Sequence, residues 1–176
     1  FQRENYINNV VAAQALEHTM PGSAARLNKD YGIQTFARYP RELLLRQLEM
    51  ESVESVPYGV VLNPREDWNG GFYGDKNVYQ KLDADTTKEG MLMRIFECES
   101  TVDAAKKLIR LNRRYGGQQK IRFALVGGHG SRENLQFGRQ RGGTFSRQLT
   151  ESDAIKELRS FFSDQAVVVL NSCSTG

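Results

Sequence analysis

Four short runs of apolar residues recur along the last two thirds of the chain. They cover residues 58–62, 91–96, 121–126 and 166–170, and polar or amphipathic segments separate them. Runs that are apolar almost throughout, rather than at every second position, are typical of strands buried on both faces of a parallel sheet. The alternation of such strands with helical segments predicts an α/β fold with right-handed crossovers, a mostly parallel central sheet and helices on both of its faces.

The segments between these strands predict two helices and one long loop. A helix is expected from Ser100 or Thr101, which cap it, to the glycine pair 116–117, which ends it. A second helix is expected to start at Thr150, with Asp153 completing a capping-box-like pair. Residues 63–80 are polar and are expected to form a long loop after the first strand, and loops of this length are usually functional or mobile. The positions expected to face the core are Val102, Ala105, Leu108 and Ile109 in the first helix, and Ile155, Leu158, Phe161 and Phe162 in the second.

The first 56 residues show a different pattern of apolar and polar positions. Apolar positions between Val10 and Met20 predict an amphipathic helix that the Pro21-Gly22 pair ends, and a second helix is expected from Pro40 to Leu48. Residues 22–39 between them are expected to be irregular. Two helices without a sheet of their own need a surface to pack on. We therefore divide the chain into a helical arm, or the end of an upstream helical region, at 1–56, and an α/β core at 57–176.

Composition and charge narrow the function classes. The chain has 176 residues, of which 39% are apolar, enough for one domain with a core. No apolar run approaches the roughly 20 residues of a membrane-spanning helix. A net charge of +3 is too small to indicate nucleic-acid binding. The two cysteines, Cys98 and Cys173, cannot form a disulfide scaffold, so we expect an intracellular, cytoplasmic location.

Chemistry-bearing residues follow the last two predicted strands. The strand 121–126 leads into Gly127-Gly128-His129-Gly130, and the strand 166–170 leads into Asn171-Ser172-Cys173. If these strands are neighbours in a parallel sheet, a thiol and an imidazole lie on the same edge. Such a pair can attack a carbonyl group and manage the protons of the thiol and the leaving group. The alternative is a loop histidine and a small buried cysteine that only fills space.

A hydrophobic strand ending in His-Gly, followed by Val-Val-Val-Leu-Asn-Ser-Cys, resembles the caspase-like (clan CD) cysteine peptidases. The 44 residues from His129 to Cys173 are close to the spacing of about 50 in caspases. The residues around Cys173 look most like the bacterial gingipain-like and CHAT branch. The resemblance covers residues 57–176, and it implies a three-layer sandwich with a mostly parallel central sheet.

The resemblance also implies roles for individual residues. Cys173 would be the nucleophile and His129 the acid and base, and the backbone N–H groups of Gly130 and Cys173 would form the oxyanion hole. Asn171, two residues before the nucleophile, would line the pocket for the substrate residue that precedes the cut. The implied reaction is hydrolysis of a peptide bond through a thioester, with no metal or organic cofactor. Two further candidates for the substrate pocket are Arg65 and Asp67, for which solvated loop charges are the alternative.

The resemblance implies partners as well. Members of this group continue past the cysteine with strands that complete the substrate groove, whereas this sequence stops three residues after Cys173. We therefore expect a second chain or a C-terminal segment to complete the groove, and self-processing would produce such a division. A peptide or protein is the expected substrate, and the N-terminal helices are a candidate surface for a protein partner.

Two rival hypotheses remain open from the sequence. In the first, the chain is a catalytically inactive caspase-like interaction or scaffold module that binds through its helical arm. In the second, a flavodoxin-like module cradles phosphate with the glycines around His129. Modification of Cys173 by a peptide electrophile, dependent on His129, separates the peptidase from the first rival. Stabilisation by phosphate ligands that survives Cys173→Ala would favour the second.

Overall fold

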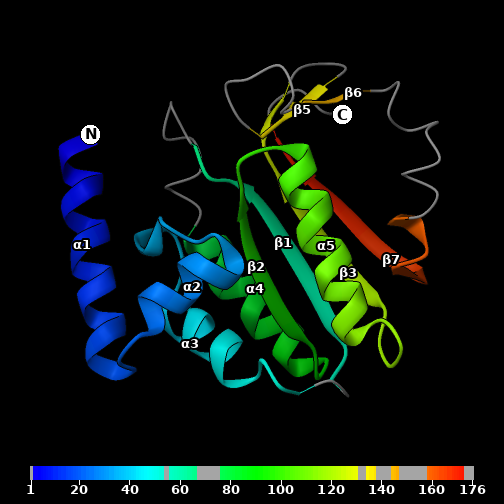
Figure 1. The fold of residues 1–176 in the computed structure, drawn as a ribbon, viewed down its shortest axis with the longest axis horizontal. Coiled ribbons are helices and arrows are strands. Elements are labelled where there is room, and N and C mark those ends of the chain that lie inside the picture. The colour runs from blue at the N-terminus through cyan, green and yellow to red at the C-terminus, as the bar shows by residue number, and fades with distance from the viewer. Residues whose placement is uncertain are drawn as a thin grey trace.

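The structure is a computed structural model that describes residues 2–53, 56–66, 76–130, 134–137, 144–146 and 158–172. Figure 1 shows its helices packed around one central sheet. The helices are α1 (Gln2–Thr19), α2 (Ser23–Tyr31), the 3-10 helix η1 (Phe36–Arg38), α3 (Arg41–Glu49), α4 (Lys76–Lys88) and α5 (Thr101–Tyr115). The strands are β1 (Tyr58–Pro64), β2 (Leu92–Cys98), β3 (Ile121–Gly127), β4 (His129–Gly130), β5 (Asn134–Gln136), β6 (Thr144–Ser146) and β7 (Phe162–Asn171).

The central sheet has four parallel strands in the order β2-β1-β3-β7. Its strands coincide with the four apolar runs of the sequence, so the predicted α/β class and parallel sheet are confirmed. All seven residues of β1 and all seven of β2 are buried. β1 is an interior strand, whereas β2 is an edge strand whose outer side is covered by α3. The sheet order also makes β3 and β7 direct neighbours, which is the condition that the predicted thiol–imidazole pair requires.

Helices cover both faces of this sheet. Tyr58, at the start of β1, packs against Tyr115 of α5, with their ring centroids 5.7 Å apart. Asn63 of the same strand donates a hydrogen bond of 2.8 Å to the hydroxyl of Tyr79 in α4. Side chains five positions apart on a strand point to opposite faces. Helices α4 and α5 therefore lie on opposite sides, and the chain forms the three layers of an α/β sandwich.

The N-terminal helices pack along the outer edge of β2. Gln47 of α3 is fully buried and pairs with the main chain of that edge strand: its Nε2 donates to the carbonyl of Ile95 (3.0 Å), and its Oε1 accepts the N–H of Ile95 (2.8 Å). Leu16 and Leu44 belong to the same buried cluster as the strand residues. The arm and the sheet therefore share one core.

The prediction of an irregular segment at 22–39 was wrong. Residues Ser23–Tyr31 form α2, and η1 follows it. Glycines at both ends of α2 adopt left-handed backbone conformations, with φ of 82° at Gly22 and 73° at Gly32. The helix therefore begins directly after Gly22 and ends directly before Gly32. Ser23, Leu27 and Tyr31 are four residues apart and make its buried face.

Three further expectations needed correction. The buried positions of α5 are Ala104, Lys107, Leu108, Leu111 and Tyr115, whereas Val102 and Ile109 are exposed. Helix α4 begins at Lys76, so residues 76–80 are helical and not part of a loop. Phe162 starts strand β7 rather than ending a helix, and residues 150–157 of that predicted helix lie outside the described residues. The cap on α5 is confirmed, because Ser100 Oγ accepts the N–H of Asp103 at 3.1 Å.

Strand β7 departs from the expected burial on both faces. Its apolar residues Val167, Val168, Val169 and Leu170 are 56%, 53%, 40% and 52% exposed. Because successive side chains of a strand alternate between faces, both faces of β7 carry exposed apolar surface. β7 is an edge strand of the described sheet, but its composition is that of an interior strand.

No helix in the described part of the chain has both the length and the apolar character needed to cross a membrane.

Candidate active site at the carboxyl edge of the sheet

The carboxyl ends of β3 and β7 form the centre of the candidate site. The two strands are paired in register up to Gly127 and Asn171, and the N–H of Gly128 donates to the carbonyl of Asn171 at 3.2 Å. His129 comes two residues after Gly127, at the start of β4, and is partly buried, as is Gly130. In the sequence, Cys173 comes two residues after Asn171 but lies outside the described residues. The strand adjacency expected for the pair is therefore confirmed, and the catalytic roles stay predictions.

The structure places the predicted substrate-binding residues Asn171 and Arg65 in different parts of the sheet edge. Asn171 ends β7, is partly buried and lies at the same edge as the turn that leads to His129. Arg65 follows β1 and forms an ion pair with Glu99, while its Nε donates to the carbonyl of Gly32 at 3.2 Å. These contacts are on the β2 side of β1, whereas β3 is on the other side. The structure does not bring Arg65 to His129, and Asp67 lies outside the described residues.

A small antiparallel sheet follows the turn. Strand β4 pairs with β5, which pairs with β6, so His129 lies opposite Gln136 and Gly130 lies opposite Leu135. Leu135 is buried and anchors this sheet to the core. The turn after β3 therefore continues into a strand and not into a helix. In the described residues, strand β4 and not a helix follows these glycines, so the phosphate-cradle hypothesis gains no support from this turn.

Four residues, one from each strand, form a row across the carboxyl edge of the sheet: Glu97 (β2), Asn63 (β1), Gly127 (β3) and Asn171 (β7). Glu97 is paired with Asn63, and Gly127 with Asn171; Gly127 comes one residue after the Leu62–Val126 pair. We call these four positions the terminal row. Residues paired in a parallel sheet share a face, so the row lies on the face that α4 covers. The predicted site is thus one end of a row that continues into the core.

Glu97 is the acid of the terminal row, and it is fully buried. It accepts hydrogen bonds from the backbone N–H groups of Gln34 (2.8 Å) and Thr35 (3.3 Å), and from the hydroxyl groups of Thr35 and Tyr39. Burial raises the pKa of the Glu97 carboxyl, and Arg38 and these donors oppose that effect. Backbone N–H groups can only donate, so the surroundings of Glu97 are arranged to receive a carboxylate.

Arg38 is the buried cation beside this carboxylate. Its Nη1 lies 3.7 Å from Glu97 Oε1 and donates to the carbonyl of Pro64 at 3.1 Å. Burial disfavours its charge, but Tyr39, Tyr79 and Glu97 outweigh that effect and hold the pKa of the guanidinium above its ordinary value. Removing one member of such a buried pair leaves an uncompensated charge and costs about 3–5 kcal/mol. The pair therefore fixes the segment around η1 against the end of β2.

Asn63, like Glu97, is a member of the terminal row that the sequence analysis missed. It is fully buried and donates through Nδ2 to the hydroxyl oxygens of Tyr39 (3.1 Å) and Tyr79 (2.8 Å). The rings of these tyrosines meet edge to face, with centroids 5.1 Å apart. The sequence offered one signal, because Asn63 is a polar residue directly after the apolar run 58–62.

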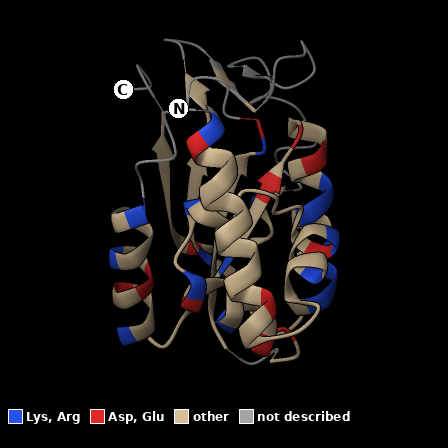
Figure 2. Ribbon diagram, turned by 90° about the vertical axis from the view of Figure 1, so that its left-hand side faces the viewer, with Lys and Arg blue, Asp and Glu red and all other residues tan. Residues whose placement is uncertain are grey.

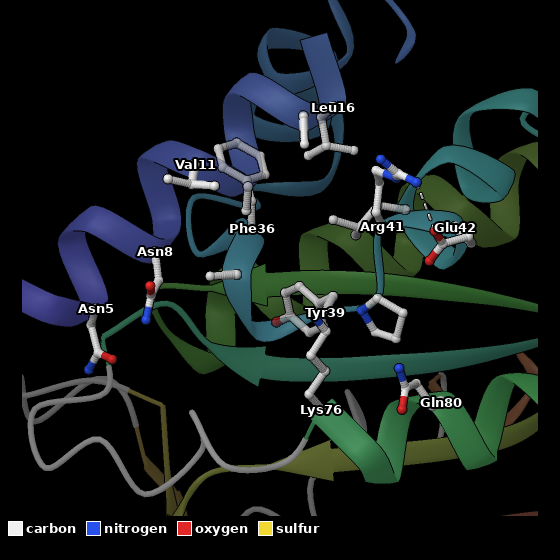
Figure 3. A pocket seen from close by; sticks show the side chains of 15 residues that line it. Asn5, Asn8, Val11, Leu16, Phe36, Tyr39, Arg41, Glu42, Lys76 and Gln80 are labelled. Atoms are coloured by element: carbon white, nitrogen blue, oxygen red, sulfur yellow. Dashed lines mark hydrogen bonds and ion pairs between the residues drawn. The ribbon is translucent and has the colours of Figure 1, made fainter. Parts of the chain in front are cut away.

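A groove of about 600 Å³ lies beside this network, between α1, the segment from η1 to α3, and the start of α4. Figure 3 shows Asn5, Asn8 and Val11 of α1 on one side of it and Lys76 and Gln80 of α4 on another. Tyr39 lines the groove with its ring, while its hydroxyl reaches Glu97. Of the predicted site residues that the structure describes, His129, Gly130 and Asn171 are not part of its lining.

Metal binding finds no support in the described ranges, where no group of three or more His, Cys, Asp or Glu side chains could hold an ion. In comparisons with known proteins, no protein-family model and no curated protein matches this chain.

Proposed function

We propose that this chain is the core of a cysteine endopeptidase of the caspase-like type, with Cys173 as nucleophile and His129 as acid and base. One observation carries the proposal: β3 and β7 are adjacent, parallel and in register at Gly127 and Asn171. His129 and Cys173 each follow these paired positions by two residues in the sequence. A nucleophile and its base must converge in space, and carboxyl ends of neighbouring parallel strands are where α/β proteins bind ligands.

The proposed reaction has two steps. The thiolate of Cys173 attacks the carbonyl carbon of a peptide bond, and the negative charge moves to the carbonyl oxygen, which the N–H groups of Gly130 and Cys173 stabilise. The imidazolium of His129 then gives its proton to the leaving amine as the C–N bond breaks, and a thioester remains. A water molecule that His129 deprotonates hydrolyses this thioester and releases the free thiol.

The exposed faces of β7 support a further part of the proposal, a polypeptide segment that completes the substrate groove. Val167–Leu170 present apolar side chains on both faces of a strand whose outer edge offers unpaired main-chain groups within the described sheet. A strand added along this edge would pair with those groups and would carry the sheet past the cysteine. A second chain or a C-terminal segment of the same chain would supply it, and self-processing remains part of this proposal.

The proposed cellular compartment follows from the reduced state of the thiols. Cys98 is free and buried, and the reaction needs the Cys173 thiol to stay reduced. We therefore propose an intracellular, cytoplasmic setting, where thiols are kept reduced.

A second candidate function, a binding module without activity, is favoured by the surface of α1. Figure 2 shows this helix nearest the viewer, with charged residues only near its two ends. Between them, Tyr6, Ile7, Val10 and Val11 are 71%, 50%, 38% and 58% exposed. An exposed apolar stretch of this kind is typical of a protein-binding surface. A protein partner on α1 is compatible with either function, so only an activity measurement separates them.

The experiment that tests the proposal is cleavage of a peptide library, read by mass spectrometry. Wild-type protein is compared with Cys173→Ala, His129→Ala and the control Cys98→Ala, with each variant's folding checked by circular dichroism. We expect cleavage by the wild type and by Cys98→Ala, and a loss of at least about 10³-fold in the other two, because each removes a reacting group. The residues before the cut report the preference that Asn171 sets.

Two results would contradict the peptidase proposal. One is cleavage that survives in folded Cys173→Ala, which would assign the activity elsewhere. The other is a folded wild-type protein that cleaves no peptide and whose Cys173 reacts with a peptide electrophile no faster in the presence of His129 than in its absence. The second result would favour the binding module.

A further inference from the structure

We infer that Asn63 is a positioning residue for the turn of residues 127–129, an inference that rests on the proposed function because His129 ends this turn. Asn63 is fully buried near the carboxyl end of β1. On β3, the residue at the same level is Gly127, one position after the Leu62–Val126 pair. Asn63 therefore lies beside the backbone that leads to His129.

The amide of Asn63 can take only one orientation. Tyr39 donates its single hydroxyl proton to Glu97 Oε1 across 3.0 Å, and burial raises the pKa of this phenol well above its ordinary value, so the proton is retained. Toward Asn63, 3.1 Å away, the Tyr39 oxygen can therefore only accept. The nitrogen Nδ2 must face Tyr39 and Tyr79, which leaves the oxygen Oδ1 facing β3.

The oxygen Oδ1 stands directly against Gly127. A Cβ atom built on Gly127 would lie 2.4 Å from Oδ1, well below contact distance. Gly127 is not among the described glycines with a left-handed backbone, so close approach, and not backbone conformation, requires a glycine here. Oδ1 is buried and makes no hydrogen bond within the described part of the chain. Its position is therefore set by the two hydroxyl groups behind it.

The turn is thus held from two sides. On the β7 side, the N–H of Gly128 donates to the carbonyl of Asn171. On the β1 side, Asn63 limits how far Gly127 can move, and Tyr39 and Tyr79 hold Asn63 from the N-terminal segment and from α4. A shift of about 1 Å in a reacting group costs on the order of 10²-fold in rate. Asn63 needs no contact with the substrate to affect the reaction.

The test compares Asn63→Ala and Tyr79→Phe with the control Tyr58→Phe. Tyr58 is also a buried tyrosine but lies at the other end of β1, facing α5. Two quantities are measured in folded protein: kcat and KM for a cleaved peptide, and the NMR resonances of the His129 ring. The chain has only two histidines, so His18→Gln assigns these resonances.

We expect Asn63→Ala to lower kcat about 10²-fold with KM within about twofold of wild type, and to shift the His129 resonances. Tyr79→Phe should lower kcat and shift the His129 resonances in the same direction but by less, and Tyr58→Phe should change neither kcat nor the resonances. Wild-type kcat and unshifted His129 resonances in folded Asn63→Ala would overturn the inference. If Asn63→Ala does not fold, the same two readouts of Tyr79→Phe decide it.

The two proposals fail in different ways. If the wild-type protein cleaves no peptide, the proposed function fails, and the His129 resonances still test the positioning: a shift in Asn63→Ala, or in Tyr79→Phe, supports it, and unchanged resonances overturn it. If the wild type is active and the Asn63 variant equals it, only the positioning inference fails.

Discussion

Replacing Gln47 by methionine should destabilise the protein strongly, although Gln47 is a polar residue on a helix. Methionine has a similar length and apolar bulk, so the change removes hydrogen bonds without opening a cavity. Gln47 is 0% exposed, and its amide satisfies both the N–H and the carbonyl of Ile95 on the outer edge of β2. These are the main-chain groups that an uncovered edge strand would leave without partners.

The magnitude follows from these two bonds. A buried donor or acceptor that loses its partner costs about 1–3 kcal/mol, and Gln47→Met leaves one donor and one acceptor without a partner. We expect a loss of about 3 kcal/mol in the free energy of unfolding, toward the lower end of the summed range because water can reach an edge strand. For a domain of this size, that corresponds to a decrease of about 6–12 °C in Tm.

The assay is urea unfolding followed by tyrosine fluorescence and circular dichroism, with Gln14→Met as the matched control. Gln14 is an exposed glutamine of α1, so its replacement should change the free energy of unfolding by no more than about 0.5 kcal/mol. If Gln47→Met unfolds at the wild-type urea concentration, the N-terminal helices do not cover β2 as described.

Three further outcomes are expected. Gly127→Ala should lower stability by about 1–3 kcal/mol, because its Cβ would overlap Asn63 Oδ1, whereas Gly117→Ala, with open space around it, should be neutral in the same thermal melts. Cys98 should not react with a thiol reagent at pH 7.5 until the protein unfolds, because burial raises its pKa to about 12; reaction in the folded state would refute this. Burial likewise raises the pKa of Tyr58 to about 12, so its protonated form is favoured in the folded state. Its contribution to stability should be complete below pH 10 and be lost as the pH rises toward 12, a decline that Tyr58→Phe should reduce and that a pH-independent urea midpoint would contradict.

The parts of the fold that the sequence predicted are those set by local pattern. Continuous apolar runs predicted all four strands of the central sheet, and Ser100 followed by Asp103 predicted the start of α5. The sequence left open whether the strands before His129 and Cys173 are neighbours, and the structure shows that they are. Parallel strands present their carboxyl ends at one edge of a sheet. The sequence positions of His129 and Cys173 after two such strands were therefore enough to predict a site at one sheet edge.

The parts that could not be predicted depend on partners distant in the sequence. Glu97 is buried because Thr35 and Tyr39, about 60 positions away, supply its hydrogen bonds. Gln47 is buried because the edge strand near Ile95 needs a partner. A polar residue gives no local signal that such a partner exists, so its exposure is the ordinary expectation.

The stripe expected on α5 failed for a related reason. Val102 is apolar but lies on the outer face, while Lys107 is buried beside Asp103, to which its ammonium group is paired. Helical periodicity allowed either side of this helix to face the core. The choice depends on what α5 packs against, which the local sequence does not contain.

The measurement that tests the central claim most directly is the intact mass of the protein after reaction with a peptide chloromethyl ketone. We compare wild type with Cys173→Ala and His129→Ala. The reference is the rate at which the same ketone reacts with a simple thiol in solution. The account predicts one added peptide on wild type, located at Cys173 and formed far faster than the reference reaction, none on Cys173→Ala, and slow addition on His129→Ala. Equal rates for wild type and folded His129→Ala would contradict a thiol–imidazole pair at the carboxyl edge of the sheet.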